Sequence, residues 1–223
     1  MNTSSFLDLT HTIAAPLFRC TEYPWQALDL IGDFINEYKK QISTDEFFVY
    51  EDNIIVSKSA EISQKAEILG PCIIGHNTVV RPFAYIRGNA IIGERCVIGN
   101  STEIKNSIVF DGAKLPHYNY VGDSVIGHLA HLGAGVILSN VRSDKAKISV
   151  RFGDSKIPTE RTKLGSIVGD HAEIGCSCVL NPGVSVGRNA IIYPLSCVRT
   201  YVPEGSFFKR HDNIVKRSDF ELQ

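Results

Sequence analysis

The segment from Asp111 to Gly127, DGAKLPHYNYVGDSVIG, carries side chains suited to proton transfer and anion binding. His117 lies near its centre, and Glu103 and Lys105 precede it. An imidazole titrates at about pH 6.5, so a histidine is a suitable general base at neutral pH. Amide formation from a thioester needs such a base, because the attacking amine must lose a proton. In this chemistry Glu103 would orient the His117 ring, and Lys105 with an arginine would neutralise a phosphate group.

A six-residue repeat surrounds this segment and must position it. Large apolar residues recur at every sixth position, and a small residue often stands two positions before each. The large residues are Ile62, Ile68, Ile74, Val80, Ile86, Ile92, Ile98, Ile104 and Phe110, then Ile126, Leu132 and Leu138, then Val168, Ile174, Leu180, Val186, Ile192 and Val198. A period of six is typical of β-helices.

The repeat predicts an all-β solenoid. Residues i and i−2 of a strand face the same side, so each short strand would point one bulky and one small side chain inward. Three such strands would form one triangular coil, and successive coils would stack by strand pairing. Cys72, Cys96 and Cys178 occupy the small inward position, so we expect them to be buried and unreactive.

The repeat divides the chain into three parts. Residues 51–204 are expected to form the β-helix, residues 1–50 an N-terminal helical cap and lead-in, and residues 205–223 a tail. Residues 24–42 carry an apolar stripe typical of an amphipathic helix, and residues 46–58 an extended lead-in. A solenoid needs an element that hides the end of its core, so we expect the helix to cover the open end of the coil.

Two segments depart from the repeat. At residues 111–120 the spacing from Phe110 to Tyr120 is ten instead of six, which predicts a loop that lifts His117 off the wall. Pro116 is unsuited to an interior strand, and Lys114 to a small inward position. Residues 139–165 form an excursion with seven basic and three acidic residues, and Gly153-Asp154 predicts a hairpin turn within it. This basic loop is either a solvated loop or a clamp for phosphate groups.

Composition excludes several classes of protein. The net charge is −1, so nothing indicates a nucleic-acid partner. The sequence has neither a long apolar run nor a recognisable secretion signal, so we expect no membrane association and a cytoplasmic location.

The motifs around His117 resemble those of the hexapeptide-repeat acyltransferases. The match is closest to the acetyltransferase domain of the bifunctional N-acetylglucosamine-1-phosphate uridyltransferase / glucosamine-1-phosphate acetyltransferases. The matching residues are Glu103 and Lys105, His117, Tyr120, Gly122 and Asp123, then Gly133-Ala134-Gly135 and Asn140. The resemblance implies a left-handed parallel β-helix, acetyl-CoA as co-substrate, no metal, and active sites between the subunits of a homotrimer. It also implies N-acetylation of an amino-sugar phosphate, with glucosamine 1-phosphate as the expected acceptor.

The resemblance also implies roles for individual residues. His117 is the general base. The expected substrate-binding residues are Lys105, Tyr120, Asn140, Arg81 or Arg87, Lys163 and His131. The expected cofactor-binding residues are Ala134, Gly135, Cys176, Pro194 and Arg210. The sequence departs from the family at His131, where the family has asparagine, and at Val141, where it has tyrosine.

Some alternatives stay open. Residues 1–60 contain one glycine and thus no glycine-rich nucleotide loop, so we expect no nucleotidyl transfer. A β-helix that lost catalysis would serve as a binding or regulatory module. A metal hydrolase like the γ-class carbonic anhydrases would need three histidines among His76, His117, His128 and His131.

Overall fold

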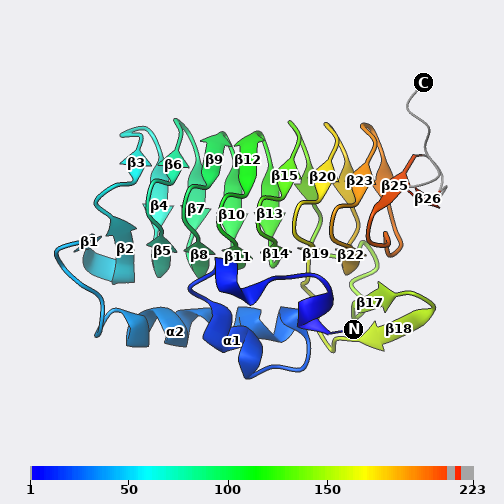
Figure 1. Ribbon diagram of the computed structural model, residues 1–223, viewed down its shortest axis with the longest axis horizontal. Helices are drawn as coiled ribbons and strands as arrows, with labels where there is room; N and C mark the ends of the chain where they lie inside the picture. The colour runs from blue at the N-terminus through cyan, green and yellow to red at the C-terminus, as the bar shows by residue number, and fades with distance from the viewer. Residues whose placement is uncertain (1, 210–213, 217–223) are drawn as a thin grey trace.

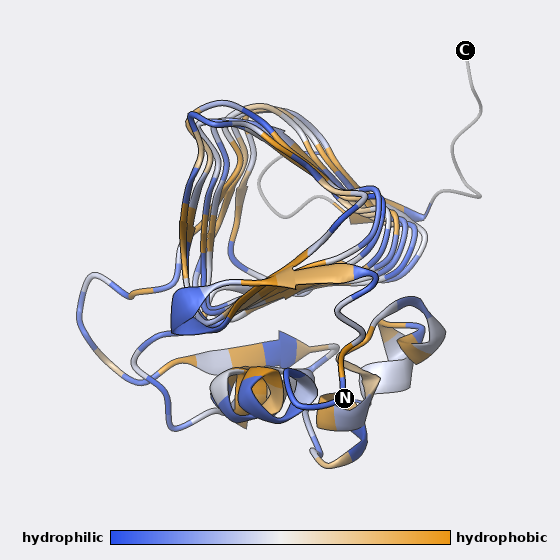
Figure 2. Ribbon diagram, turned by 90° about the vertical axis from the view of Figure 1, so that its left-hand side faces the viewer, coloured by the Kyte–Doolittle hydropathy of each residue, from blue (hydrophilic) through white to orange (hydrophobic). Residues whose placement is uncertain are grey.

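A computed structural model describes residues 2–209 and 214–216, which form a left-handed parallel β-helix with three flat sides (Figures 1 and 2). We name the sides sheets A, B and C. Each coil runs from sheet B to sheet C to sheet A, which defines a B–C, a C–A and an A–B corner.

Short strands that pair with the coils above and below make up each sheet. Sheet A has the order β1 (Phe47–Val49), β2 (Ile54–Ser57), β5 (Cys72–Ile74), β8 (Ala90–Ile92), β11 (Ser107–Val109), β14 (Val125–Ile126), β19 (Ser166–Val168) and β22 (Val184–Val186). Sheet B has the order β26 (Ile214–Lys216), β25 (Ser206–Phe208), β23 (Ile191–Ile192), β20 (Glu173–Ile174), β15 (His131–Leu132), β12 (Lys114–His117), β9 (Val97–Asn100), β6 (Val79–Val80) and β3 (Glu61–Ile62). Sheet C has the order β24 (Cys197–Val198), β21 (Val179–Leu180), β16 (Ile137–Leu138), β13 (Tyr120–Gly122), β10 (Glu103–Lys105), β7 (Tyr85–Arg87) and β4 (Glu67–Leu69). The coil therefore continues to Phe208, four residues beyond the expected boundary at 204.

The interior confirms the role of the small inward positions. Cys72, Cys96 and Cys178 are fully buried inside the coil. Burial raises the pKa of the Cys72 and Cys96 thiols to about 12, so neither forms a reactive thiolate at neutral pH.

The expected loop at 111–120 is wrong, because the chain there stays in the coil. Most coils have 18 residues, as in the pairing of Glu61 with Val79. Two successive coils have 17, since Ser107 pairs with Ala90 and Val125 pairs with Ile108. Each lacks one residue at the C–A corner, so the inward position moves from the residue expected by sixes to its predecessor.

The shortened corners explain why a count in sixes assigns the wrong residues to the inward positions after Ile104. Val109 rather than Phe110 fills the bulky inward position, and the next two are Leu115 and Val121, all of them fully buried in the core. The spacings are five, six and six residues, so the chain makes no ten-residue excursion. Lys114 lies on the exposed face of β12 and leaves the small inward position to Ala113.

Pro116 lies within an interior strand, contrary to expectation. It belongs to β12, which pairs with β9 on one side and β15 on the other. The pairing with β15 is reduced to Lys114 with His131, consistent with the backbone donor that proline lacks. On the other side, a Cβ at Gly99 would lie 1.6 Å from the Pro116 carbonyl oxygen. Glycine at 99 therefore lets the Pro116 backbone approach.

The N-terminal helices cover a side of the coil and not its end, which corrects the cap prediction (Figures 1 and 2). They are η1 (Thr3–Ser5), η2 (Leu9–His11), α1 (Ala15–Arg19), η3 (Pro24–Leu30) and α2 (Ile31–Tyr38), and η4 (Glu51–Asn53) follows before β2. The single helix expected over 24–42 is thus a 3-10 segment followed by an α-helix.

Sheet A explains why these helices lie where they do. The outward side chains of its strands are apolar and fully buried against the helices. They are Ile55, Ile73, Ile91, Ile108, Val125 and Ile167. Leaving this strip in water would forgo the hydrophobic stabilisation of six β-branched side chains. The signal was present in the sequence, because every third repeat unit has an apolar residue before its inward one.

The basic excursion contains the hairpin expected at Gly153-Asp154. It consists of β17 (Ser149–Phe152) and β18 (Ser155–Pro158), paired antiparallel. Val150 is buried with the helices against sheet A, and the Phe152 ring contacts that of Phe6 at 5.6 Å between centroids. The excursion therefore extends the cover over sheet A.

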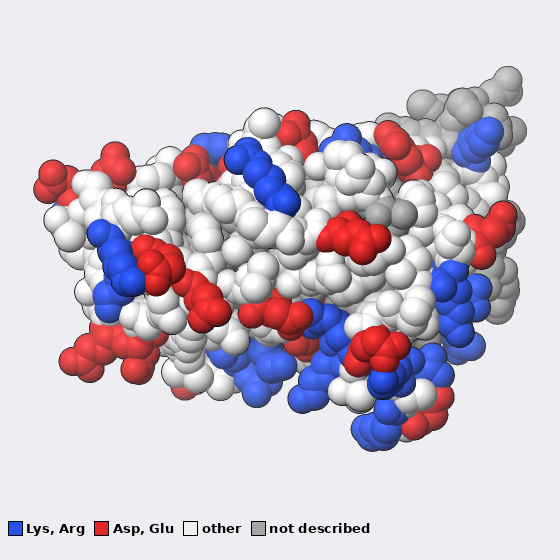
Figure 3. Space-filling model, turned by 90° about the horizontal axis from the view of Figure 1, so that it is seen from below, with Lys and Arg blue, Asp and Glu red and all other residues white. Residues whose placement is uncertain are grey.

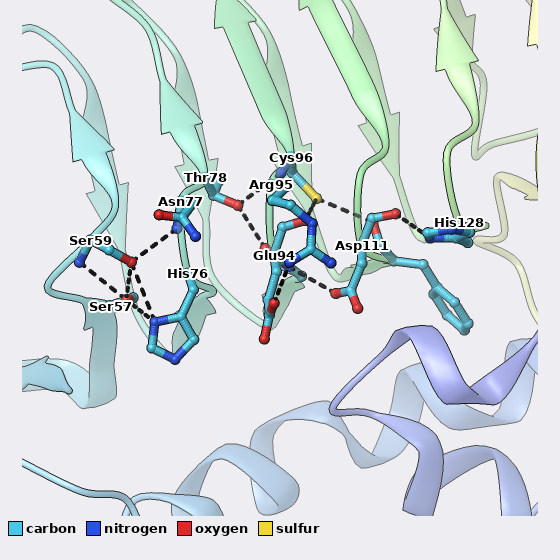
Figure 4. Close-up of polar contacts among 12 residues, drawn as sticks. Ser57, Ser59, His76, Asn77, Thr78, Glu94, Arg95, Cys96, Asp111 and His128 are labelled. Atoms are coloured by element: carbon cyan, nitrogen blue, oxygen red, sulfur yellow. Dashed lines mark hydrogen bonds and ion pairs between the residues drawn. The ribbon is translucent and has the colours of Figure 1, made fainter.

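The A–B corner is held by a ladder of polar contacts between coils (Figure 4). The Thr78 hydroxyl donates to the Gly93 carbonyl at 2.7 Å, and the Glu94 amide donates to the Asp111 carboxylate at 2.8 Å. The His128 ring makes a 2.7 Å hydrogen bond to the Asp111 carbonyl and stacks on His11 of η2 at 3.7 Å. The corner thereby fastens the N-terminal segment to the coil.

We expect the stability of this corner to fall with acidification. Burial lowers the pKa of His128, so the unfolded chain binds the proton first as pH falls, and stability is lost below about pH 6.5. The charged or titratable groups around it are Asp8, His11, Asp111, Asp170, His171 and Arg188. Burial raises the pKa of Asp111 and Asp170, which acts in the opposite direction at lower pH. The urea concentration at the midpoint of unfolding should fall as the pH is lowered from about 7.5 to about 5.5. In His128→Gln this dependence on pH should be weaker. A variant slope equal to that of the parent chain would contradict this assignment.

No helix in the described part of the chain is long and apolar enough to cross a membrane.

Candidate active site

His117 lies at the B–C corner, at the end of β12, with its ring exposed. Its carbonyl accepts a hydrogen bond from the Gly135 amide at 3.0 Å, and its own amide donates to the Asn119 side chain at 3.2 Å. Asn119 is buried and donates to the Gly133 carbonyl at 2.8 Å. Two neighbouring coils therefore fix the backbone of His117. Asn119 was not predicted as a site residue from the sequence.

The residues predicted to bind the cofactor stack in one column with His117. The Gly135 amide bonds to His117, the Ser177 amide donates to Ala134 at 2.8 Å, and the Leu195 amide donates to Cys176 at 2.9 Å. Pro194 precedes Leu195 at the same corner of the next coil. Ala134, Gly135, Cys176 and Pro194 thus form an edge that continues from His117 along the helix axis.

A polar cluster lies across sheet C from this edge, at the C–A corner, and Asp123 is its centre. Asp123 is 4% exposed, and its carboxylate accepts hydrogen bonds from Asn106 at 2.8 Å and from Asn140 at 2.5 Å. The Lys105 ammonium lies 3.6 Å from it. The structure therefore brings Lys105 and Asn140 together through Asp123, a residue of the motif to which no role was assigned.

Tyr120 lies beside this cluster. A Cβ at Gly122 would come within 2.6 Å of the Tyr120 hydroxyl oxygen and 2.9 Å of the Asn140 amide nitrogen. Gly122 therefore leaves room for both side chains. Burial raises the pKa of Tyr120, so its hydroxyl is a neutral donor at neutral pH.

Asp123→Asn should destabilise the fold. An asparagine side chain has one acceptor oxygen, so Asn106 and Asn140 would compete for it and one partly buried donor would lose its partner. We expect a loss of about 2 kcal/mol in the free energy of unfolding. Urea denaturation measures it, with Asp154→Asn at the exposed hairpin turn as the matched control. Equal stability of the two variants would show that Asp123 does not organise this corner.

Glu103 contacts Arg87 rather than His117. Its carboxylate lies 2.8 Å from the Arg87 guanidinium, and this hydrogen bond raises the pKa of Arg87. Glu103 is on sheet C, whereas His117 is on sheet B. Within a single chain the Glu103 carboxylate therefore does not contact the His117 ring. Arg87 lies next to Lys105 in the parallel register, while Arg81 lies at the B–C corner.

The remaining predicted residues are dispersed. His131 is on sheet B, where its ring bonds to Glu173 at 2.8 Å. Lys163 precedes Leu164, whose amide donates to the Asn140 carbonyl at 2.9 Å, so its backbone runs beside the polar cluster. Arg210 lies outside the described residues.

The four histidines weighed as metal ligands do not converge. His76 and His128 are at the A–B corner, His117 is at the B–C corner and His131 is on sheet B. In the described residues no group of three or more His, Cys, Asp or Glu side chains is arranged to hold a metal ion.

Comparison with known proteins identifies relatives of this chain by sequence. A family model described as the GMPPB C-terminal domain matches residues 68–152. A bifunctional sugar-1-phosphate nucleotidylyltransferase/acetyltransferase of Sulfurisphaera tokodaii is 38% identical over 165 residues, which cover 71% of this chain and 41% of that protein. The bifunctional protein GlmU of Methanococcus maripaludis is 35% identical over 195 residues, 86% of this chain and 47% of that protein. The chain is homologous to the acetyltransferase half of these bifunctional proteins. It spans less than half the length of these two relatives.

Solved structures of an acetyltransferase domain and of an N-acyltransferase are also similar to this chain. The acetyltransferase domain of PglB from Neisseria gonorrhoeae aligns with a TM-score of 0.40 and 13% identity, over 83% of this chain and 67% of that chain. A point mutant of AntD, an N-acyltransferase from Bacillus cereus, aligns with a TM-score of 0.39 and 19% identity, over 81% of this chain and 86% of that chain.

Proposed function

We propose that this protein is an acetyl-CoA-dependent N-acetyltransferase that acts on an amino-sugar phosphate. The observation that carries the proposal is the alignment of His117 with Ala134, Cys176 and Pro194 along the B–C corner. A thioester held along this edge would reach the imidazole from one side. The acceptor would approach over sheet C, whose face carries the basic residues.

The His117 ring serves as the general base. It removes a proton from the acceptor amine while the nitrogen attacks the thioester carbonyl. The tetrahedral intermediate then collapses, the C–S bond breaks, and the thiolate of coenzyme A takes up a proton. The products are an amide and the free thiol, so the reaction balances without any further reactant.

The phosphate of the acceptor is assigned to Lys105, with Arg87, Tyr120 and Asn140 as further contacts. Lys105 and Arg87 already have acidic partners in Asp123 and Glu103. The side chains of Lys105 and Arg87 are both partly exposed. An incoming phosphate would therefore compete with the two carboxylates for these cations rather than enter a preformed cavity. Because the Sulfurisphaera relative is a sugar-1-phosphate protein by name, glucosamine 1-phosphate is the first acceptor to test.

A homotrimer completes the site in this proposal. Large apolar side chains stand exposed at the B–C corner, namely Phe83 at 59%, Tyr118 at 62% and Leu195 at 83%. Exposed apolar groups along one edge are typical of surfaces that a partner covers. A second copy seated there would close the open side of His117. Light scattering after size-exclusion chromatography should give about three times the chain mass of 24.6 kDa.

The decisive test of function is an acceptor screen. The purified chain is incubated with acetyl-CoA and each of glucosamine 1-phosphate, glucosamine 6-phosphate and glucosamine, and thiol release is recorded. We expect release that depends on the amine and on the phosphate. Release that continues without an amine would indicate hydrolysis and contradict the proposal.

A binding or regulatory module is the second candidate. It is favoured by one observation: no side chain in the described part of the protein bonds to the His117 ring to orient it. In that case calorimetry would detect acetyl-CoA binding while no amine in the screen is acetylated.

A further inference from the structure

A second basic site lies at the C–A corner, between the hairpin and the last coils. A cavity of about 480 Å³ opens there. Its lining includes Arg142, Asp144, Arg151, Lys156, Asn181 and Arg199, together with serine and threonine hydroxyls. Four cations face one carboxylate, and Figure 3 shows Lys and Arg side chains gathered around the hairpin and the neighbouring coils.

The cations of this cavity differ in whether they have an acidic partner. Arg142 and Asp144 form a two-contact ion pair, at 2.9 and 2.5 Å. Among the residues that the structure describes, no carboxylate pairs with the side chains of Arg151, Lys156 or Arg199. The cavity is therefore strongly positive.

The hairpin contains an arrangement that costs stability unless an anion is present. Arg151 and Lys156 lie directly opposite one another in the antiparallel register. Like charges in such a pair repel, and the pair is destabilising relative to an uncharged one. The Arg151 carbonyl is tied to the coil, because it accepts a 2.6 Å hydrogen bond from the Ser185 hydroxyl. The backbone that carries these two lining residues is thus fixed to the coil rather than on a free loop.

The cavity is separate from the acetyl-CoA edge, which is the edge formed by Ala134, Gly135, Cys176 and Pro194. Ser139 and Asn181 in its lining follow Ala134 and Cys176 by five residues each, along strands of sheet C. At about 3.3 Å per residue this is about 16 Å, the width of one side of the coil. The cavity also has the size of a small-molecule site, much larger than one phosphate needs.

We propose that this cavity binds a small molecule carrying a diphosphate group, such as a nucleoside diphosphate, at a site distinct from the acetyl-CoA edge. Arg151 and Lys156 hold one phosphate from the hairpin wall, and Arg199 holds the other from the coil wall. The hydroxyl and amide groups of the lining donate further hydrogen bonds. The bound diphosphate relieves the repulsion between Arg151 and Lys156.

Calorimetry with ADP, AMP, adenosine and inorganic pyrophosphate tests this proposal directly. We expect ADP and pyrophosphate to bind, AMP to bind about tenfold more weakly, and adenosine not to bind. Arg151→Ala with Lys156→Ala should weaken ADP binding by about tenfold or more. The double variant Lys40→Ala with Lys58→Ala removes the same charge elsewhere and should leave the affinity within about twofold.

Two further measurements are needed. Thermal melting distinguishes a loss of binding from a loss of folding, and competition with coenzyme A distinguishes this cavity from the acetyl-CoA edge. The hairpin variant should melt at the parent temperature or above it, because it loses a repulsive pair. ADP should bind equally well with saturating coenzyme A present. Absence of ADP binding, equal affinity for AMP, an equal loss in the control variant, or displacement of ADP by coenzyme A would each overturn the proposal.

The source of the diphosphate follows from kinetics. If it belongs to the acceptor, the hairpin variant raises KM for a nucleotide-linked amino sugar and leaves KM for the sugar monophosphate unchanged. If it is a free effector, ADP changes the rate with the monophosphate, and the hairpin variant abolishes that change. The binding measurements need no acetyl transfer, so they stand or fall independently of the proposed function.

Discussion

His117→Ala should lower the turnover of acetyl transfer by about 100-fold or more while the chain remains folded. The imidazole would be the group that takes the amine proton, and alanine offers no replacement. The ring is exposed and its backbone contacts do not depend on the side chain, so the corner should keep its shape. Thiol release measures the loss, and thermal melting checks the fold.

His76→Ala is the matched control for this variant. His76 lies at the A–B corner, where its ring bonds to Ser57 at 2.7 Å (Figure 4). Its loss should cost some stability and leave turnover unchanged. Parent-level activity in His117→Ala would remove His117 from the mechanism, and with it the alignment on which the proposed function rests.

Gly99→Ala should both destabilise the protein and reduce its activity. The added carbon would lie 1.6 Å from the Pro116 carbonyl oxygen and 2.4 Å from its Cα. Both are backbone atoms, so no rotamer change relieves the clash and two coils must separate locally. We expect a loss of about 3 kcal/mol in the free energy of unfolding, at the upper end for overpacking.

The loss of activity in Gly99→Ala should be larger than the loss of folded protein explains. His117 follows Pro116 directly, and a displacement of about 1 Å at a catalytic group costs about 100-fold in rate. Gly32→Ala in the first turn of α2 is the control, since alanine suits a helix and the added carbon would meet a side-chain atom, the Asn89 amide oxygen at 3.1 Å, and no backbone of another coil. If Gly99→Ala matches the control in urea midpoint, the close approach of β9 and β12 is not required.

These two variants separate the chemistry from the scaffold. His117→Ala removes the reacting group and leaves the coil intact. Gly99→Ala leaves the group and moves the strand that carries it. A fall in activity in both, with a fall in stability in the second alone, is the pattern that the geometry predicts.

The side chains that face the interior of the coil could be predicted from the sequence. Each hexapeptide must place one bulky and one small residue inside a narrow coil, so the requirement is local and repeats. It correctly placed Cys72, Cys96 and Cys178 in the core, and the Gly153-Asp154 pair correctly predicted the hairpin.

The surroundings of the outward-facing side chains were decided by tertiary structure. Whether an outward side chain meets water, a helix or an ion pair depends on segments far away in the chain. The apolar strip of sheet A draws the N-terminal helices to a side of the coil, although the same helices were expected at its end. Glu103 meets Arg87 because sheet C places them on adjacent strands, and this takes it away from His117.

The break in the repeat around His117 shows most clearly what residue spacing alone does not predict. A shortened corner and an inserted loop both disturb a count of sixes, and spacing alone does not distinguish them. The strand pairing does, because 17-residue coils keep Leu115 inside and Pro116 against Gly99. The sequence by itself thus determined the repeat and the inward residues, since these depend on neighbours within one coil. Only the tertiary structure decided which faces are covered and where the polar groups meet, since these depend on contacts between coils and with the helices.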